Sequence, residues 1–107
     1  MVYKSENSEV YCTTEGHSYS LDYATDSFGK RIDLEFQNGA VKEVGGRNGW
    51  QNEELLAVLI DRLKFLNGKF ACRENSIVIT KLEEALMWLE KRAADRKVRG
   101  VEGLDKV

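Results

Sequence analysis

One long uninterrupted stretch constrains the fold of this chain more than any other feature. From Arg73 to Arg99 the sequence contains neither glycine nor proline, the two residues that most often interrupt a helix. Leu82, Leu86 and Leu89 recur at the spacing of one helical face, so the stretch predicts a single long amphipathic helix. We assign its leucine stripe to the hydrophobic core.

The two ends of this predicted helix differ chemically. Asn75 lies in the first turn, where backbone N–H groups lack helical partners and the helix dipole is positive. Residues 91–99 include five basic residues and one acidic residue, a local charge of +4. Arg92, Arg96 and Arg99 fall at i, i+4 and i+7, so their guanidinium groups share one face. This face is either an anion-binding site or a solvated basic end that complements the helix dipole.

A second helix is predicted from Glu53 to Leu66. Asn52 is a suitable N-cap, and Asn67-Gly68 supplies a C-terminal stop. Because only a short segment separates this helix from the long one, the two should form an antiparallel hairpin. Their apolar faces are too broad for one hairpin to bury alone. The expected partners are the sheet and a second subunit.

The N-terminal half shows the alternation of polar and apolar residues that is typical of strands. Asn38-Gly39 is a strong hairpin signal, because a type I′ turn requires positive φ at both positions. We predict a loop at Thr25–Lys30 and strands at Glu9–Thr13, Ser18–Ala24, Ile32–Gln37 and Ala40–Val44. The predicted fold class is α+β. A small antiparallel sheet in residues 1–50 precedes a helical hairpin with a short tail in residues 51–107, and together they form one compact ligand-binding domain.

The glycine-rich segment from Gly45 to Gly49 allows two interpretations. Its backbone N–H groups and Arg47 could approach an anion, or the glycines simply turn the chain from sheet to helix. The sequence contains neither a P-loop motif nor a strand–GxGxxG–helix motif, so neither of those nucleotide sites is predicted.

Composition narrows the classes of function. A net charge of −2 argues against a general binder of duplex nucleic acid. No apolar run has the length of a membrane span, and the N-terminus lacks the apolar region of a signal peptide, so we expect a cytoplasmic protein. Cys12 and Cys72 lack a CxxC partner and are interpreted as apolar filler. With His17 as the single histidine, in an expected turn, we predict no metal, no cofactor and no catalytic centre.

Three runs of sequence carry a resemblance to a known family: FQNGAVKEVGGRNGWQNEELLAVLIDRL, FLNGKFACREN and TKLEEALMWLEKRAADRKVRGVEG. They closely resemble the bacteriophage anti-Thoeris sponges, which share their helical hairpin with the anti-CBASS cyclic-dinucleotide sponges. The resemblance spans Phe36 to Gly103. Residues 1–31 are similar only to the kind of β extension that the family carries.

The resemblance implies a non-enzymatic protein that sequesters a cyclic ADP-ribose isomer (gcADPR) made by TIR-domain Thoeris sensors, without degrading it. It implies that Phe65 forms an aromatic wall, that Asn75 hydrogen-bonds the ligand, and that Arg92 and Arg96 hold its phosphates. Arg99 and the segment Gly100–Gly103 are candidates for a second site that takes cyclic di- or trinucleotides. The remaining candidate ligand-binding residues are Arg73 and Asp95.

The resemblance also implies a homodimer, or a hexamer built as a trimer of dimers, in the cytoplasm of the infected bacterial host. Neither duplex nucleic acid nor a membrane is an expected partner. Three alternatives remain open. The first is a sponge for the cyclic oligonucleotides of CBASS signalling, alone or at an additional site. The second is a phosphodiesterase or ADP-ribose hydrolase, which the single histidine and the missing metal cluster disfavour. The third is a structural hairpin whose arginines pair with Glu90 and Asp95.

Overall fold

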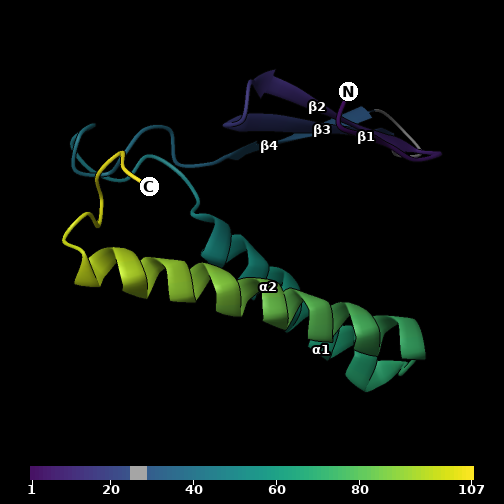
Figure 1. The fold of residues 1–107 in the computed structure, drawn as a ribbon. Helices are drawn as coiled ribbons and strands as arrows, with labels where there is room; N and C mark the ends of the chain where they lie inside the picture. Colours follow the sequence, from purple (N-terminus) through teal and green to yellow (C-terminus); the bar gives the residue numbers. More distant parts are fainter. Residues whose placement is uncertain (25–28) are drawn as a thin grey trace. The chain divides into compact units, whose positions relative to one another are not determined.

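A computed structural model describes residues 1–24 and 29–107 of the chain, with four strands followed by two helices. The strands lie side by side in one sheet, and the helices run antiparallel as a hairpin (Figure 1). The predicted α+β class is confirmed. The chain divides into two units, described separately below. One is Met1–Asn38 with Arg47–Gly49, and the other is Gly39–Gly46 with Trp50–Val107.

The sheet has the order β1-β2-β3-β4 with every neighbouring pair antiparallel. Its strands are β1 (Tyr3–Lys4), β2 (Ser8–Thr14), β3 (Ser18–Ala24) and β4 (Gly29–Glu35). The short strand β1 was not predicted, because two residues carry no periodic signal. The predicted loop at 25–30 is too long at its C-terminal end, since Gly29 and Lys30 pair with Ala24 and Tyr23. Residues 25–28 of that loop lie outside the described residues.

The register of the strands separates an apolar face from a polar one. Val10, Leu21 and Ile32 are cross-strand neighbours, as are Cys12, Tyr19 and Leu34, so these side chains share one face. The opposite face carries Tyr11, Ser20 and Asp33 as neighbours. There the buried Ser20 hydroxyl donates to Asp33 Oδ1 at 2.7 Å and accepts from Arg31 Nη2 at 3.0 Å.

The predicted returning strand Ala40–Val44 is wrong. The segment forms hydrogen-bonded turns instead, in which Glu43 N and Val44 N both donate to Ala40 O, at 2.9 and 3.0 Å. Asn38 does not adopt the positive φ that a type I′ turn requires. Its backbone is already paired, because the Asn48 side-chain amide accepts from Asn38 N and donates to Asn38 O, both at 2.8 Å. A side chain therefore takes the place of a partner strand.

Helix α1 (Asn52–Lys69) is longer at both ends than predicted. The N-cap is Gln51 rather than Asn52, and the Gln51 backbone N–H donates to the Glu54 carboxylate at 2.9 Å. The predicted stop at Asn67-Gly68 is wrong, because the helix continues to Lys69. The Asn67 side chain instead reaches the next helix, where its Oδ1 accepts from Cys72 N at 3.0 Å.

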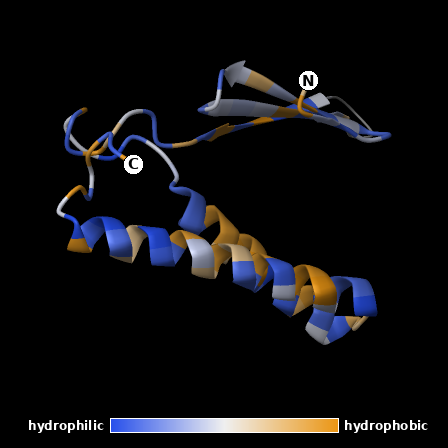
Figure 2. Cartoon of the chain, viewed as in Figure 1, coloured by the Kyte–Doolittle hydropathy of each residue, from blue (hydrophilic) through white to orange (hydrophobic). Residues whose placement is uncertain are grey.

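Helix α2 (Arg73–Val98) confirms the predicted long helix to within a residue. It packs against α1 around a small core in which Ile60 and Ile79 are buried, and a Lys64–Glu83 ion pair of 3.0 Å joins the two helices. Figure 2 shows hydrophobic residues along both helices. Many stay between 42% and 56% exposed in the single chain: Val58, Leu59, Ile77, Val78, Met87 and Trp88.

Candidate functional site

The C-terminal end of α2 carries four of the predicted ligand-binding residues: Arg92, Asp95, Arg96 and Arg99. We call these four residues the basic end. Asp95 and Arg99 form an ion pair of 3.3 Å between Oδ2 and Nε, one helical turn apart. Within the described part of the chain, Arg92 is exposed and makes no hydrogen bond or ion pair. Arg92 is therefore available to an anion, whereas Arg99 is partly neutralised by its neighbour.

Arg96 is held by the segment that follows the helix, residues 100–107, which we call the tail. The tail begins with a Schellman motif, in which Gly100 N donates to Lys97 O and Val101 N donates to Arg96 O. Gly100 has a φ of +74°, the left-handed conformation that this motif requires. The tail then turns back over the helix end. Arg96 Nη2 donates to Val101 O at 3.1 Å and to Leu104 O at 2.5 Å.

The tail is also attached to the 39–46 loop of the same unit (Figure 1). Lys42 N donates to Gly103 O at 2.9 Å, and Asp105 N donates to a Glu43 carboxylate oxygen at 3.3 Å. The Gly103 α-carbon lies so close to the Lys42 side chain that an added Cβ would be 2.9 Å from Lys42 Cγ. The tail thus has defined contacts on two sides.

The other predicted ligand-binding residues lie at the hairpin turn: Phe65, Arg73 and Asn75. We call these three residues the turn cluster. Phe65 is 61% exposed, and Lys69 Nζ lies 4.8 Å from the centre of its ring. Asn75 is half-buried, and its backbone N–H donates to Cys72 Sγ at 3.4 Å. Among the described residues no hydrogen bond is made by the Asn75 side-chain amide, so this group is available to a ligand.

The conformation of the hairpin turn is fixed by a small polar network that the sequence did not reveal. Asn67 Nδ2 donates to Ser76 Oγ at 3.2 Å, and Ser76 Oγ donates to Cys72 O, also at 3.2 Å. With the Asn67–Cys72 bond described above, these contacts close a ring around the first turn of α2. No periodic pattern marks Asn67 for this role, because its partners lie across a change of chain direction.

The structure does not bring the turn cluster and the basic end together within one chain. Asn75 and Arg92 are 17 positions apart on one continuous helix, a separation of about 26 Å along the axis. A single nucleotide-sized ligand cannot contact both groups of one copy. If both groups serve one ligand, they must come from different copies of the chain.

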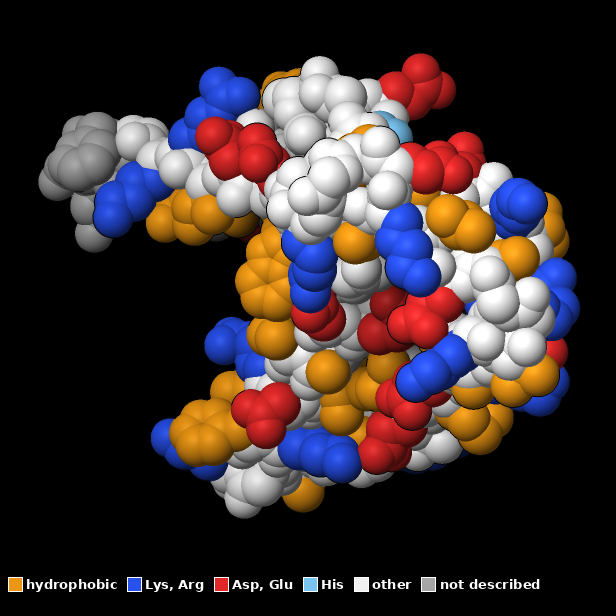
Figure 3. All heavy atoms as spheres, turned by 90° about the vertical axis from the view of Figure 1, so that its left-hand side faces the viewer, with side chains coloured by type: hydrophobic (Ala, Val, Ile, Leu, Met, Phe, Trp, Pro, Cys, Tyr) orange, Lys and Arg blue, Asp and Glu red, His pale blue; other side chains and the backbone are white. Residues whose placement is uncertain are grey.

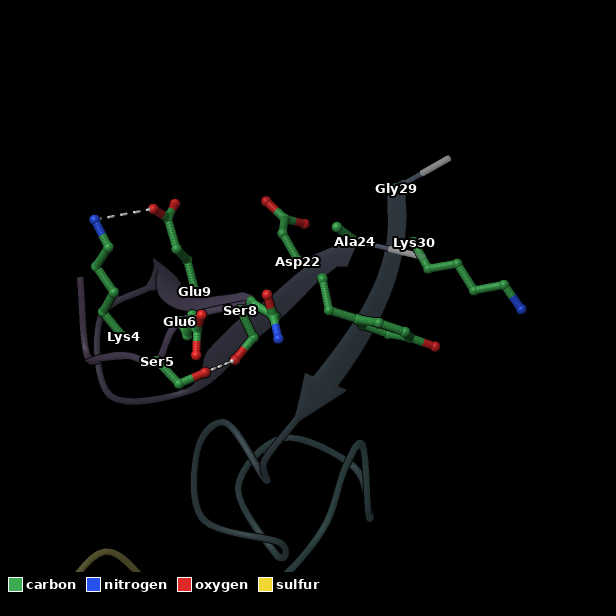
Figure 4. A pocket seen from close by; sticks show the side chains of 11 residues that line it. Lys4, Ser5, Glu6, Ser8, Glu9, Asp22, Ala24, Gly29 and Lys30 are labelled. Atoms are coloured by element: carbon green, nitrogen blue, oxygen red, sulfur yellow. Dashed lines mark hydrogen bonds and ion pairs between the residues drawn. The ribbon is translucent and has the colours of Figure 1, made fainter. Parts of the chain in front are cut away.

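Two hollows in the structure have the wrong charge for a phosphate ligand. A hollow of about 460 Å³ between α1 and α2 has Ile60, Leu86 and Met87 in its apolar lining, and its charged lining residues are Asp61, Glu83 and Glu90 against Lys64 alone. A second hollow of about 460 Å³ lies in the sheet unit (Figure 4). Its lining includes three carboxylates, those of Glu6, Glu9 and Asp22, against two lysines, Lys4 and Lys30.

The described residues offer little for other kinds of chemistry. They hold no group of three or more histidine, cysteine or carboxylate side chains suited to a metal ion. None of the helices among them is long and apolar enough to span a bilayer. On the face drawn in Figure 3, basic side chains are interspersed with acidic and hydrophobic ones. That face therefore does not offer the continuous basic surface typical of duplex binding.

Comparison with known proteins agrees with this hairpin architecture. The family model described as the Acb2/Tad1 hairpin domain matches residues 30–94. This range contains the turn cluster and Arg92 but ends before Asp95, Arg96 and Arg99. The chain is also 57% identical over 79 residues to the protein named Thoeris anti-defense 1 of Bacillus phage SBSphiJ7. That match covers 73% of this chain and 55% of the relative, so the chain spans about half the length of that curated protein. The chain belongs to the Acb2/Tad1 hairpin-domain family.

Proposed function

We propose that this chain is a phage anti-defence sponge that acts in the cytoplasm of an infected bacterium. It binds a cyclic ADP-ribose isomer made by TIR-domain Thoeris sensors and withholds it from the defence effector, without turnover. Membership of the Acb2/Tad1 hairpin-domain family and identity with Thoeris anti-defense 1 support an anti-defence role. The choice of ligand rests on the chemistry of the turn cluster and the basic end.

Each group of residues suits one part of such a ligand. The exposed face of the Phe65 ring offers a flat apolar surface for an adenine base. The unpaired Asn75 amide can both donate to and accept from the ligand. The pyrophosphate carries negative charge, which Arg92 and Arg96 would bind through the parallel N–H donors of their guanidinium groups.

The observation that carries the proposal is that the Asn75 amide and the Arg92 guanidinium both lack partners among the described residues. They lie about 26 Å apart along α2. Each set alone is half of a nucleotide site, because one offers base recognition and the other offers phosphate recognition. A homodimer in which the turn cluster of one copy meets the basic end of the other would complete two sites. The broad apolar surface left exposed on the hairpin supports such an assembly.

The decisive test is calorimetric titration with cyclic ADP-ribose isomers and with cyclic dinucleotides. We expect submicromolar binding of a cyclic ADP-ribose isomer by the full chain, lost in Asn75→Ala and in Arg92→Ala/Arg96→Ala. Lys97→Ala is the matched control, because it removes a positive charge from the same helix end but not from the arginine face. Binding of cyclic dinucleotides alone would identify a CBASS sponge instead, and no binding of either class would refute the proposal.

A second measurement separates a sponge from an enzyme. The protein is incubated with the bound nucleotide, denatured, and the released ligand is identified by mass spectrometry. A sponge returns the intact cyclic nucleotide in amounts equal to the sites filled. Recovery of a linear or cleaved product in excess over protein would show turnover and would refute sequestration.

A further inference from the structure

The tail occupies the Arg96 nitrogen that a phosphate would need. A guanidinium presents two pairs of parallel N–H donors, one formed by Nε with Nη2 and the other by Nη1 with Nη2. Nη2 belongs to both pairs. Because the carbonyl oxygens of Val101 and Leu104 both lie against Arg96 Nη2, both pairs are blocked for bidentate binding of a phosphate.

The tail leaves the charge of Arg96 in place while it takes these donors. Its acceptors are neutral carbonyl oxygens rather than carboxylates, so the guanidinium remains attractive to an anion. A phosphate oxygen is a stronger acceptor than a carbonyl oxygen, because its hydrogen bond with a guanidinium is charge-assisted. Displacement of the tail by a phosphate is therefore chemically favoured. Arg92, one turn away and without a partner among the described residues, needs no such exchange.

We propose that the tail is a releasable strap: a phosphate group that binds Arg96 in bidentate fashion displaces the Leu104 carbonyl from the guanidinium. With it go the two contacts that hold the end of the tail, Asp105 N to the Glu43 carboxylate and Arg99 Nη2 to Val107 O. The inference rests on the proposed function in one respect, that the phosphates of the ligand bind Arg96. The Schellman motif at Gly100 and the Lys42–Gly103 hydrogen bond keep the start of the tail attached, so the release is local. The strap selects for ligands whose phosphate can compete with the Leu104 carbonyl oxygen.

A variant can weaken the strap without changing Arg96. Gly103 has a φ of +74°, which valine adopts only with strain, and a side chain there would meet Lys42. Gly103→Val therefore disfavours the docked tail both through its backbone conformation and through this contact. Gly16→Val is the matched control, because Gly16 has a φ of +73° but nothing within 4 Å of an added Cβ. It imposes the same backbone strain in a turn of the other unit.

The test uses inorganic pyrophosphate and cyclic ADP-ribose as probes on the full chain, with nuclear magnetic resonance and calorimetry. We expect the heteronuclear NOEs of the amides of residues 104–106 to fall when pyrophosphate saturates the protein, which reports faster motion of the tail. Gly103→Val should bind pyrophosphate about three to ten times more tightly than the wild type. This factor corresponds to the free energy of roughly one hydrogen bond, which the phosphate no longer has to break. Gly16→Val should bind as the wild type does.

The outcomes separate the strap from the proposed function. Unchanged NOEs at saturation, or no gain in affinity for Gly103→Val, would overturn the strap. Release of the tail by pyrophosphate without binding of cyclic ADP-ribose would support the strap and overturn the sponge. Tight binding of cyclic ADP-ribose with the tail still docked would support the sponge and overturn the strap. In the unliganded protein, Arg96→Met should by itself mobilise the tail, because it removes the nitrogen that donates to both carbonyl oxygens; a rigid tail in that variant would contradict the strap.

Discussion

A mixture of two inactive variants should recover binding if the ligand site is shared between copies. Asn75→Ala removes the amide of the turn cluster, and Arg92→Ala/Arg96→Ala removes the phosphate ligands of the basic end. Neither homodimer retains a complete site. In a heterodimer, one site combines both defects, whereas the other combines the intact Asn75 of one copy with the intact arginines of its partner.

The expected recovery follows from the geometry. Asn75 and Arg92 are 17 positions apart on one continuous helix, about 26 Å, so a ligand that touches both must bridge two copies. After free exchange of subunits at equal concentrations, about half of the dimers are heterodimers, and one of their two sites is intact. The mixture should therefore bind about a quarter as much ligand as the wild type, with unchanged affinity.

Calorimetry on the mixture measures this directly, because stoichiometry and affinity are separate parameters of the titration curve. The mixture must first be incubated long enough for subunits to exchange, which mass spectrometry of differently tagged copies can verify. Zero recovery in a mixture with verified heterodimers would refute the shared site. So would retained binding by either variant alone.

Three further predictions concern stability. Asn48→Ala should lower the free energy of unfolding of the sheet unit by about 1–2 kcal/mol, because both hydrogen bonds to Asn38 are lost. Asn48→Asp keeps the acceptor for Asn38 N but turns a carboxylate oxygen toward Asn38 O, so it should lose at least as much in urea denaturation; a stability equal to the wild type would contradict the role of these two hydrogen bonds. Ile79→Ala should cost about 2–4 kcal/mol, since Ile79 is one of two buried isoleucines of the hairpin. A cost below that of Ile79→Val would refute this assignment. The Ser20 hydroxyl lowers the pKa of Asp33 below 3.8, followed by the charge of Arg31. Asp33 therefore stabilises the fold above its unfolded pKa, and this contribution disappears as pH falls through the lowered pKa. In Asp33→Asn, the free energy of unfolding should therefore fall less steeply as the pH is lowered. An unchanged dependence on pH would contradict this role of Asp33.

The elements predicted correctly are those in which local pattern and tertiary contact agree. The leucine spacing of α2 is matched by a half-buried face at Leu82, Leu86 and Leu89. The alternation of β3 and β4 is matched by their antiparallel pairing, although Ile32 on the apolar face stays 53% exposed. Two of the predictions that failed depend on side-chain hydrogen bonds that no periodic pattern marks. Asn48 replaces the returning strand, and Asn67 binds across the hairpin turn while the helix runs past its expected stop.

The candidate residues could be named from the sequence, whereas their arrangement in the fold could not. The guanidinium spacing of the basic end follows from helical periodicity alone. The docking of the tail onto Arg96 does not, because it uses backbone carbonyl oxygens, which every residue possesses. The separation of the turn cluster from the basic end follows only once α2 is known to be continuous.

Because α2 is continuous, its length fixes the distance between the turn cluster and the basic end. If two copies form a shared site, the number of residues between Asn75 and Arg92 sets the spacing at which complementary groups meet. Inserting seven residues would restore the arginines to nearly the same face, yet carry them about 10 Å along the axis. Substitutions within this segment change one side chain, whereas insertions and deletions shift every contact beyond them. Variation among functional hairpins of this design should therefore occur by replacement inside α2 and by change of length outside it.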